Sequence, residues 1–229
     1  SNNTMQQGPS STRFITFALL IILIAAINTV QATKGLDLSV FQGDVPQTAW
    51  NCLHSNGYEF AIIQALKSNG QVNEYCVHDI QRAKAAGFKY VDIYVFPDFA
   101  RGVASAGGQI RSAVDYVHSN GQTFGMVWID IEAPSLWGKC ADNIQFLRNM
   151  IAAGHNMGLS MGIYASKYQW QSIMCSSTEF SKFPLWYPHY DNSPSFSDFE
   201  AFGGWSKPAI KQYTGTTALC GTELDQNYY

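Results

Sequence analysis

The chain has 229 residues, 46% of them hydrophobic and 14% aromatic, and a formal net charge of −3 at pH 7. This composition excludes a disordered or low-complexity chain, and the length is sufficient for one hydrophobic core. No cluster of lysines or arginines occurs. A nucleic-acid-binding protein needs a basic patch against the phosphates, so we expect no nucleic-acid partner.

The first 32 residues are predicted to form a secretory signal peptide. Arg13 precedes an apolar run over residues 14–27, which at about 14 residues is short for a membrane span. Val30 and Ala32 then supply the small residues of a cleavage site. An uncleaved N-terminal anchor is the alternative for the same run.

Removal of this leader would define the mature chain. Residues 1–4 precede Met5 and are expected to be an upstream remnant, and a single domain is expected over residues 33–229. Without Arg13 the chain has 13 basic and 17 acidic residues, a net charge of about −4. We expect a secreted, lysosomal or phagosomal protein that is monomeric and has no stable membrane association after cleavage.

All five cysteines lie in the mature part, at positions 52, 76, 140, 175 and 220. In an exported protein they predict up to two disulfides and one unpaired thiol, and about 15 arrangements stay open. Their spacing contains no CxxC or Cys/His ligand pattern. We therefore predict neither a structural zinc nor any other metal or cofactor.

Hydrophobic periodicity predicts alternating strands and helices through the first two thirds of the mature chain. The predicted strands are residues 35–40, 58–66, 90–96, 124–132 and 160–166, and the predicted helices are 47–56, 74–86, 109–119, 141–153 and 167–174. The first four helices are expected to end at Asn56-Gly57, Gly87, Asn120-Gly121 and Gly154. Three strands at 185–190, 210–213 and 223–229 follow without intervening helices. Eight strands predict an α/β fold, an irregular TIM-like barrel of five βα units followed by three strands.

The strand over residues 124–132 ends in two carboxylates. Asp130 and Glu132 are two positions apart, so they share one face of the strand at roughly 6–7 Å. Repulsion and desolvation raise the pKa of such a pair, which is what a glycoside hydrolase needs from its proton donor. Two acids on a solvated strand end are the structural alternative.

Further acids lie on other predicted strands. Asp37 lies on the first strand, Asp92 on the third and Asp225 on the eighth. Barrel enzymes place catalytic groups at the C-terminal ends of several strands, so we predict that these acids converge with Asp130 and Glu132. For Asp37 and Asp92 the alternative is structural, a hydrogen bond to a backbone amide or to another polar group inside the barrel.

Aromatic side chains accompany the acids. Tyr94, Tyr164, Trp186 and Tyr190 lie on candidate strands, and flat rings on a cleft wall stack on sugars. With Gln212 and Asp225 they are the predicted substrate-binding residues. Core packing is the alternative for each ring. Among the histidines, only His189 is expected to lie near the site.

Several segments together identify a resemblance to a known family. They are GLDLSVFQG, VDIYVFPD, WIDIE, GIYAS, LWYPHYD, PSFSDFEAFGGWSKPAIKQYTG and the terminal LDQNYY, in this order. With them the mature chain resembles the glycoside hydrolase family 25 lysozymes, the Chalaropsis-type N-acetylmuramidases, particularly their small secreted eukaryotic members. The resemblance implies a compact β/α barrel that cleaves the β-1,4 bond between N-acetylmuramic acid and N-acetylglucosamine in bacterial peptidoglycan.

The resemblance also implies residue roles. Glu132 would protonate the glycosidic oxygen, and Asp130 would stabilise charge on the sugar or orient its acetamido group. Asp37, Asp92 and Asp225 match acids of the first, third and last family motifs. The family is regarded as retaining, with the substrate's own acetamido group as nucleophile, and direct attack by an aspartate stays open beside it. Eukaryotic relatives often have a cysteine pair after the third strand, where this chain has Pro97-Asp98.

Three other functions are compatible with the sequence. A barrel that binds peptidoglycan or chitin with little catalysis would not need the intact Asp130/Glu132 pair. A chitinase-like hexosaminidase usually has a longer acidic run than Asp130-Ile131-Glu132. A disulfide-stapled structural or toxin-like protein would not need converging acids at all. For the lysozyme we expect maximal activity on the acid side of neutrality, because the −4 charge repels anionic cell walls.

Overall fold

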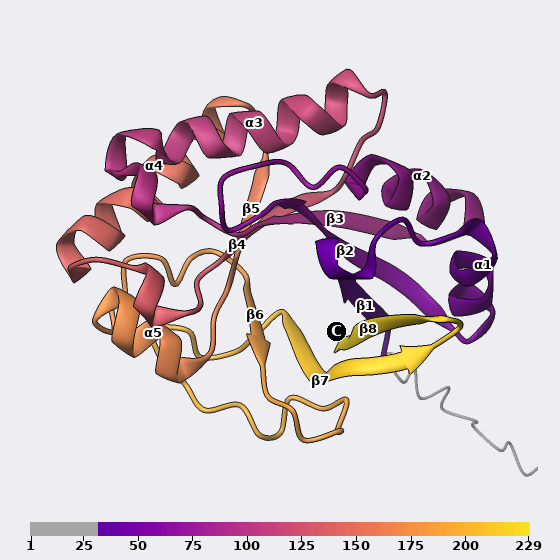
Figure 1. Ribbon diagram of the computed structural model, residues 1–229. Coiled ribbons are helices and arrows are strands. Elements are labelled where there is room, and N and C mark those ends of the chain that lie inside the picture. Colours follow the sequence, from indigo (N-terminus) through magenta and orange to yellow (C-terminus); the bar gives the residue numbers. More distant parts are fainter. Residues whose placement is uncertain (1–31) are drawn as a thin grey trace, which may run out of the picture. The chain divides into compact units, whose positions relative to one another are not determined.

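The structure, a computed structural model, describes residues 32–229 (Figure 1). The predicted signal peptide therefore lies outside the described residues, apart from Ala32. Within residues 32–229, no helix is both long enough and apolar enough to span a membrane.

Eight strands close into a barrel in chain order (Figure 1). They are β1 (Lys34–Leu38), β2 (Tyr58–Leu66), β3 (Tyr90–Val95), β4 (Met126–Asp130), β5 (Ser160–Tyr164), β6 (Leu185–Pro188), β7 (Ile210–Leu219) and β8 (Thr222–Tyr228). Strands β1 to β7 pair in parallel, whereas β8 is antiparallel to both β7 and β1. The predicted eight-stranded α/β barrel is confirmed, and its irregularity is the reversed closing strand.

Within residues 32–229, five helices follow the first five strands (Figure 1). They are α1 (Gln47–Ser55), α2 (Cys76–Ala86), α3 (Ala106–Ser119), α4 (Cys140–Asn156) and α5 (Lys167–Met174). Four 3-10 turns lie in the loops: η1 (Val40–Gln42), η2 (Phe99–Arg101), η3 (Val103–Ser105) and η4 (Pro134–Leu136). Strands β6, β7 and β8 follow one another without a helix between them, as the sequence predicts.

The side chains of strands β2 to β6 divide between two apolar layers. In β4, Val127 and Ile129 pack in the layer between strands and helices, whereas Trp128 points into the barrel. The interior layer is largely aromatic and consists of Phe60, Ile62, Tyr94, Trp128, Tyr164, Trp186 and Ile210. This alternation places Asp130, two residues after Trp128, on the interior side. A pocket at the end of the barrel can therefore be built from strand residues.

One predicted helix end is wrong. Helix α4 continues through Gly154 to Asn156, and the left-handed residue after it is Gly158, with φ of 71°. Gly154 is needed for packing, because a Cβ there would lie 2.3 Å from Sδ of Met161 on β5. The helix end predicted at Gly87 is confirmed, with φ of 103° at the C-cap.

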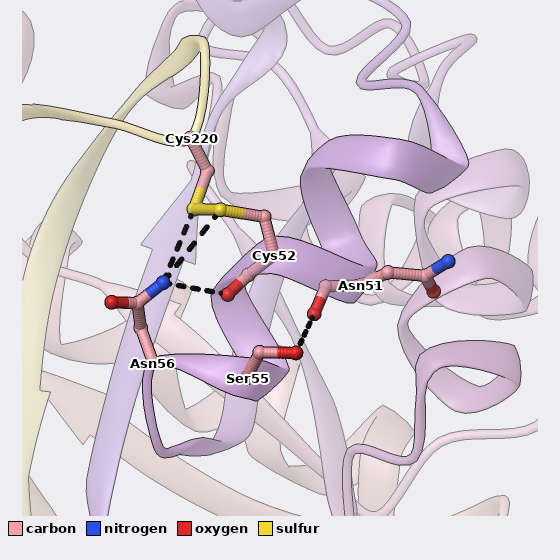
Figure 2. Close-up of a disulfide and its surroundings, with 5 residues drawn as sticks. All are labelled: Asn51, Cys52, Ser55, Asn56 and Cys220. Atoms are coloured by element: carbon pink, nitrogen blue, oxygen red, sulfur yellow. Dashed lines mark hydrogen bonds between the residues drawn. A yellow bond between two sulfur atoms is a disulfide. The ribbon is translucent and has the colours of Figure 1, made fainter.

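Two disulfides form, Cys52–Cys220 and Cys140–Cys175, and Cys76 is the unpaired, buried thiol. The first fastens the tip of the β7–β8 hairpin to helix α1 (Figure 2). Asn56 lies against this bridge, with its Nδ2 3.6 Å from both sulfurs and donating to the Cys52 carbonyl oxygen at 2.8 Å (Figure 2). The number of disulfides agrees with the prediction, and the pairing is a finding of the structure.

Candidate active site

A pocket of about 220 Å³ opens at the C-terminal ends of the parallel strands. Nine of the ten predicted site residues line this acidic pocket: Asp37, Tyr94, Asp130, Glu132, Tyr164, Trp186, Tyr190, Gln212 and Asp225. They come from seven of the eight strands and from the loops that follow β4 and β6. The convergence that barrel topology predicts is present, and Asp92 alone does not take part.

Strand β4 delivers the two central carboxylates. Asp130 is its last residue and is only 5% exposed, and Glu132 is half-buried just beyond the strand. Trp137 Nε1 donates to the Glu132 carbonyl oxygen at 2.8 Å, which fixes the loop behind that residue. Asp130 Oδ1 is buried without a hydrogen-bond partner among the described residues. A buried orphan acceptor is costly, so this oxygen is suited to a donor from a ligand.

Asp37 is held by two side-chain amides. Gln212 Nε2 and Asn227 Nδ2 donate to its Oδ2 at 2.8 and 2.7 Å. The same Gln212 amide reaches Asp225 Oδ2 at 3.2 Å. Asn227 also accepts from Trp186 Nε1 at 2.8 Å, so it joins an acid to an aromatic wall. The prediction missed Asn227, although it stands in the LDQNYY segment.

Gln212 uses both ends of its side chain. Its Oε1 accepts hydrogen bonds from the hydroxyls of Tyr164 and Tyr190, both at 2.8 Å. The Tyr164 ring packs edge-on against Trp186, with the centroids 4.5 Å apart. Gln212 therefore ties two tyrosines of the pocket wall to Asp37 and Asp225, and the orientation of these groups is set before any ligand binds.

Asp92, which the sequence groups with the catalytic acids, does not line the acidic pocket. Its Oδ1 accepts from the Met126 backbone N–H at 2.8 Å and its Oδ2 from Trp128 Nε1 at 2.9 Å. Asp92 is the third residue of β3, below the strand's C-terminal end, whereas Tyr94 two positions later lines the pocket. Asp92 therefore matches the structural alternative, in which its carboxylate accepts hydrogen bonds from a backbone amide and from another polar group inside the barrel.

Five residues that line the pocket were not predicted: Ser39, Phe41, Gln42, Gln64 and Phe96. Phe41 and Gln42 lie in the η1 turn after β1, and Ser39 is its N-cap, which makes a reciprocal capping box with Gln42. Gln64 Oε1 accepts from the Val40 N–H at 2.9 Å and so anchors the turn to β2. Ser39, Phe41 and Gln42 lie in the GLDLSVFQG segment and Phe96 lies in VDIYVFPD, but no charge or periodicity distinguishes these residues in the sequence.

Burial dominates the electrostatics of the pocket. It raises the pKa values of Asp37 and Asp130 well above their ordinary range, and neighbouring carboxylates add to the effect. The pKa of Glu132 is raised by burial, lowered by a hydrogen bond from Gln169 and raised by Asp225. No lysine or arginine lines the pocket. The acids in this pocket therefore keep their protons to higher pH than the same side chains would in water.

His189 does not line the acidic pocket, although its chain neighbour Tyr190 does. Together with Asp191 and Asp198 it is the only group of three potential metal ligands within residues 32–229. The buried ammonium of Lys211 already lies against two of them, 2.8 Å from Asp191 Oδ2 and 2.7 Å from Asp198 Oδ1. The cluster is thus an ion-paired network that holds the loop after β6.

Comparison with known proteins gives consistent matches along the chain. The family model described as Lysozyme-like protein 1 matches residues 28–213. "Probable GH family 25 lysozyme 2" of Dictyostelium discoideum is 42% identical over 217 residues, 95% of this chain and 99% of the relative. "Probable GH family 25 lysozyme 4" of the same organism is 40% identical over 213 residues, 93% and 98% of the two chains.

A solved structure agrees with the fold. The muramidase from Acremonium alcalophilum has a TM-score of 0.68 and 20% identity, over 86% of this chain and 93% of that one.

Proposed function

The chain belongs to the GH family 25 lysozymes, and from this premise we propose that its acidic pocket hydrolyses the β-1,4 bond between N-acetylmuramic acid and N-acetylglucosamine in bacterial peptidoglycan. The protein is a glycoside hydrolase. The observation that carries the proposal is the meeting of Asp130 and Glu132 with Asp37 and Asp225 in one pocket with aromatic walls.

Glu132 is proposed as the general acid. Burial raises its pKa, so it keeps its proton to higher pH than a solvated glutamate does, and it is partly open to a ligand just beyond the end of β4. Its proton passes to the glycosidic oxygen as the bond from that oxygen to the anomeric carbon breaks. The resulting carboxylate then takes a proton from the water that completes hydrolysis.

Asp130 is proposed to receive the substrate's 2-acetamido group. Its unpartnered Oδ1 can accept the acetamido N–H, which turns the acetamido oxygen toward the anomeric carbon. That oxygen forms the new bond as the leaving sugar departs, and water later opens the intermediate with net retention. This substrate-assisted route is preferred over direct attack by Asp130, because the orphan oxygen needs a hydrogen-bond donor.

The remaining predicted residues are proposed to bind the sugar. Tyr94, Tyr164, Trp186 and Tyr190 offer ring faces and polar edges, as sugar recognition requires. Gln212 and Asp225 supply hydrogen-bonding groups at the β7–β8 side of the pocket. Asp37 is proposed as a third catalytic acid, since two amides direct its carboxylate beside Asp225.

The proposed place of action is outside the cytosol. Two disulfides are typical of secreted or lysosomal proteins, because cytosolic thiols stay reduced. A removed leader before residue 33 and a monomeric barrel complete this proposal. Peptidoglycan is the proposed partner, and no cofactor enters the proposed chemistry.

The test is clearing of a bacterial cell-wall suspension at about pH 5 by the wild type and by Glu132→Gln, with the released ends identified by mass spectrometry. Loss of a general acid should lower turnover by about 10²- to 10⁴-fold. Glu59→Gln is the matched control, because Glu59 pairs with Lys89 near the start of β2, outside the pocket. New reducing ends on muramic acid are expected, and release from chitin alone would contradict the proposed substrate.

A further inference from the structure

A second hollow adjoins the acidic pocket. This hairpin groove, about 510 Å³ in volume, is lined by Phe41 and Gln42 of η1 and by residues 218–223 of the β7–β8 hairpin. Phe41 and Gln42 also line the acidic pocket, so the two hollows share one wall. The groove has more than twice the volume of the pocket. A polymer that extends past Phe41 and Gln42 from the pocket therefore meets the groove next.

Phe41 lies at the boundary of the two hollows and is 91% exposed. Such exposure of a large apolar ring is unfavourable in water, yet the backbone beneath it is rigid. Ser39 Oγ accepts from the Phe41 N–H at 3.3 Å, and Gln42 Oε1 accepts from the Ser39 N–H at 2.8 Å. The ring is thus presented by a fixed turn, which lowers the entropy cost of binding a flat partner.

The opposite wall is fixed as well. The Cys52–Cys220 disulfide ties the hairpin tip to helix α1, and Asn56 packs against both sulfurs (Figure 2). Without this bridge the tip of the hairpin, beyond the residues that pair with β1 and β6, would be held by the β7–β8 pairing. The position of the hairpin tip relative to helix α1 is therefore set by a covalent bond.

Charge restricts the occupant. No lysine or arginine lines the groove, and Glu223 is its only charged residue. Glu223 would repel the carboxylates of peptidoglycan stem peptides, whereas it can accept hydrogen bonds from sugar hydroxyls. An aromatic ring beside hydrogen-bond acceptors is the combination that recognises a pyranose.

We propose that the hairpin groove is a glycan-binding site that extends the acidic pocket, with Phe41 as the stacking platform for an uncharged N-acetylhexosamine of the same strand. This inference rests on the proposed function, because its occupant is part of that substrate. The enzyme would thus prefer long glycan strands over short fragments.

The test compares binding of stem-peptide-free peptidoglycan disaccharide and hexasaccharide by calorimetry, in a Glu132→Gln background that prevents turnover. We expect the hexasaccharide to bind more tightly, and Phe41→Ala to remove roughly three- to tenfold of that gain, the size of a lost aromatic stacking contact. Phe41→Trp should restore it. Tyr90→Ala, which removes another exposed aromatic ring at the start of β3, should match the parent.

A second variant tests the hairpin wall. Ala218→Tyr adds a ring at an exposed position of the groove and should weaken hexasaccharide binding more than disaccharide binding. If both Phe41→Ala and Ala218→Tyr bind the hexasaccharide more tightly than the disaccharide by the same factor as the parent, the hairpin groove is not a glycan-binding site. The proposed function would still stand. If tighter binding of the longer glycan requires stem peptides, or if the protein self-associates and Phe41→Ala abolishes this, the occupant of the groove is not a sugar. A wild type that releases no muramic acid ends would overturn both proposals.

Discussion

Gln212 donates a hydrogen bond from its side-chain amide to Asp37 at 2.8 Å, across the barrel interior. The two residues lie on β7 and β1, which are not paired with each other because β8 lies between them. The oxygen of the Gln212 side-chain amide accepts hydrogen bonds from the hydroxyls of Tyr164 and Tyr190. One side chain therefore couples barrel closure to the orientation of the pocket acids.

Gln212→Leu should lower both stability and activity. The leucine has a similar size but leaves the buried Tyr164 hydroxyl without its acceptor, and it leaves the Asp37 carboxyl with the Asn227 amide as its one remaining donor among the described residues. We expect the free energy of unfolding to fall by about 1–3 kcal/mol, measured by urea denaturation, with at least a tenfold loss of wall clearing. Unaltered stability would show that the bridge contributes nothing to barrel closure.

The pH dependence of activity should follow Glu132. Its pKa is raised, so the protonated form that donates to the glycosidic oxygen persists above the ordinary range and is lost as pH rises through the raised value. Activity should therefore peak on the acid side of neutrality. Asp225→Asn removes a neighbouring carboxylate that raises this pKa, so the alkaline limb of the pH–rate profile should move to lower pH. A limb that moves upward would contradict the assignment.

Asp92→Asn should affect stability more than chemistry. The asparagine amide can accept one of the two hydrogen bonds from Met126 and Trp128, but its NH₂ group faces the other donor. A loss of about 1–3 kcal/mol in unfolding free energy is expected, with the shape of the pH–rate profile retained. Asp130→Asn is the comparison, and there the profile should change. A large loss of turnover in fully folded Asp92→Asn would return Asp92 to the catalytic acids.

Asp79 should contribute more to stability at acid pH than at neutral pH. Burial raises the pKa of Asp79 to about 7, although Trp50 Nε1 donates to its Oδ1 at 3.2 Å. The folded state thus holds a proton that the unfolded chain releases near its ordinary pKa of 3.8. This stability is fully present below that value and is lost as pH rises through about 7, at about 1.4 kcal/mol per unit of pKa difference.

Asp79→Asn tests this directly, because it cannot titrate. Its melting temperature should decline less between pH 5 and pH 8 than that of the wild type. Asp115→Asn is the matched control, since Asp115 lies exposed on α3. Parallel melting curves for Asp79→Asn and the wild type would exclude Asp79 as the titrating group.

The two disulfides should differ in their contribution to stability. Cys52–Cys220 spans 168 residues and Cys140–Cys175 spans 35. Loop-closure entropy gives about 5 and about 4 kcal/mol for the two, so the Cys52→Ser/Cys220→Ser pair should lower the unfolding free energy more than Cys140→Ser/Cys175→Ser. Calorimetric melting of both double variants measures the order. The reverse order would show that strain or residual structure outweighs chain entropy.

Local pattern in the sequence predicts much of this molecule. Strand β2 and helix α5 have the predicted bounds, since apolar period and turn residues act over a few neighbours. Alternation along β4 also predicts that Asp130 lies on the same face as Trp128, inside the barrel. Because parallel strands bring their carboxyl ends together, nine site residues could be predicted to meet before their distances were known.

Tertiary structure decided what local pattern does not encode. Asp37 and Asp92 are both acids within apolar strands, and only their height in the barrel separates a pocket acid from an acceptor for Trp128. The Cys52–Cys220 pairing and the Gln212–Asp37 bond each join residues more than 160 positions apart. Such partners are set by the closing of the barrel, whose strand stagger is a property of the whole sheet rather than of any one segment.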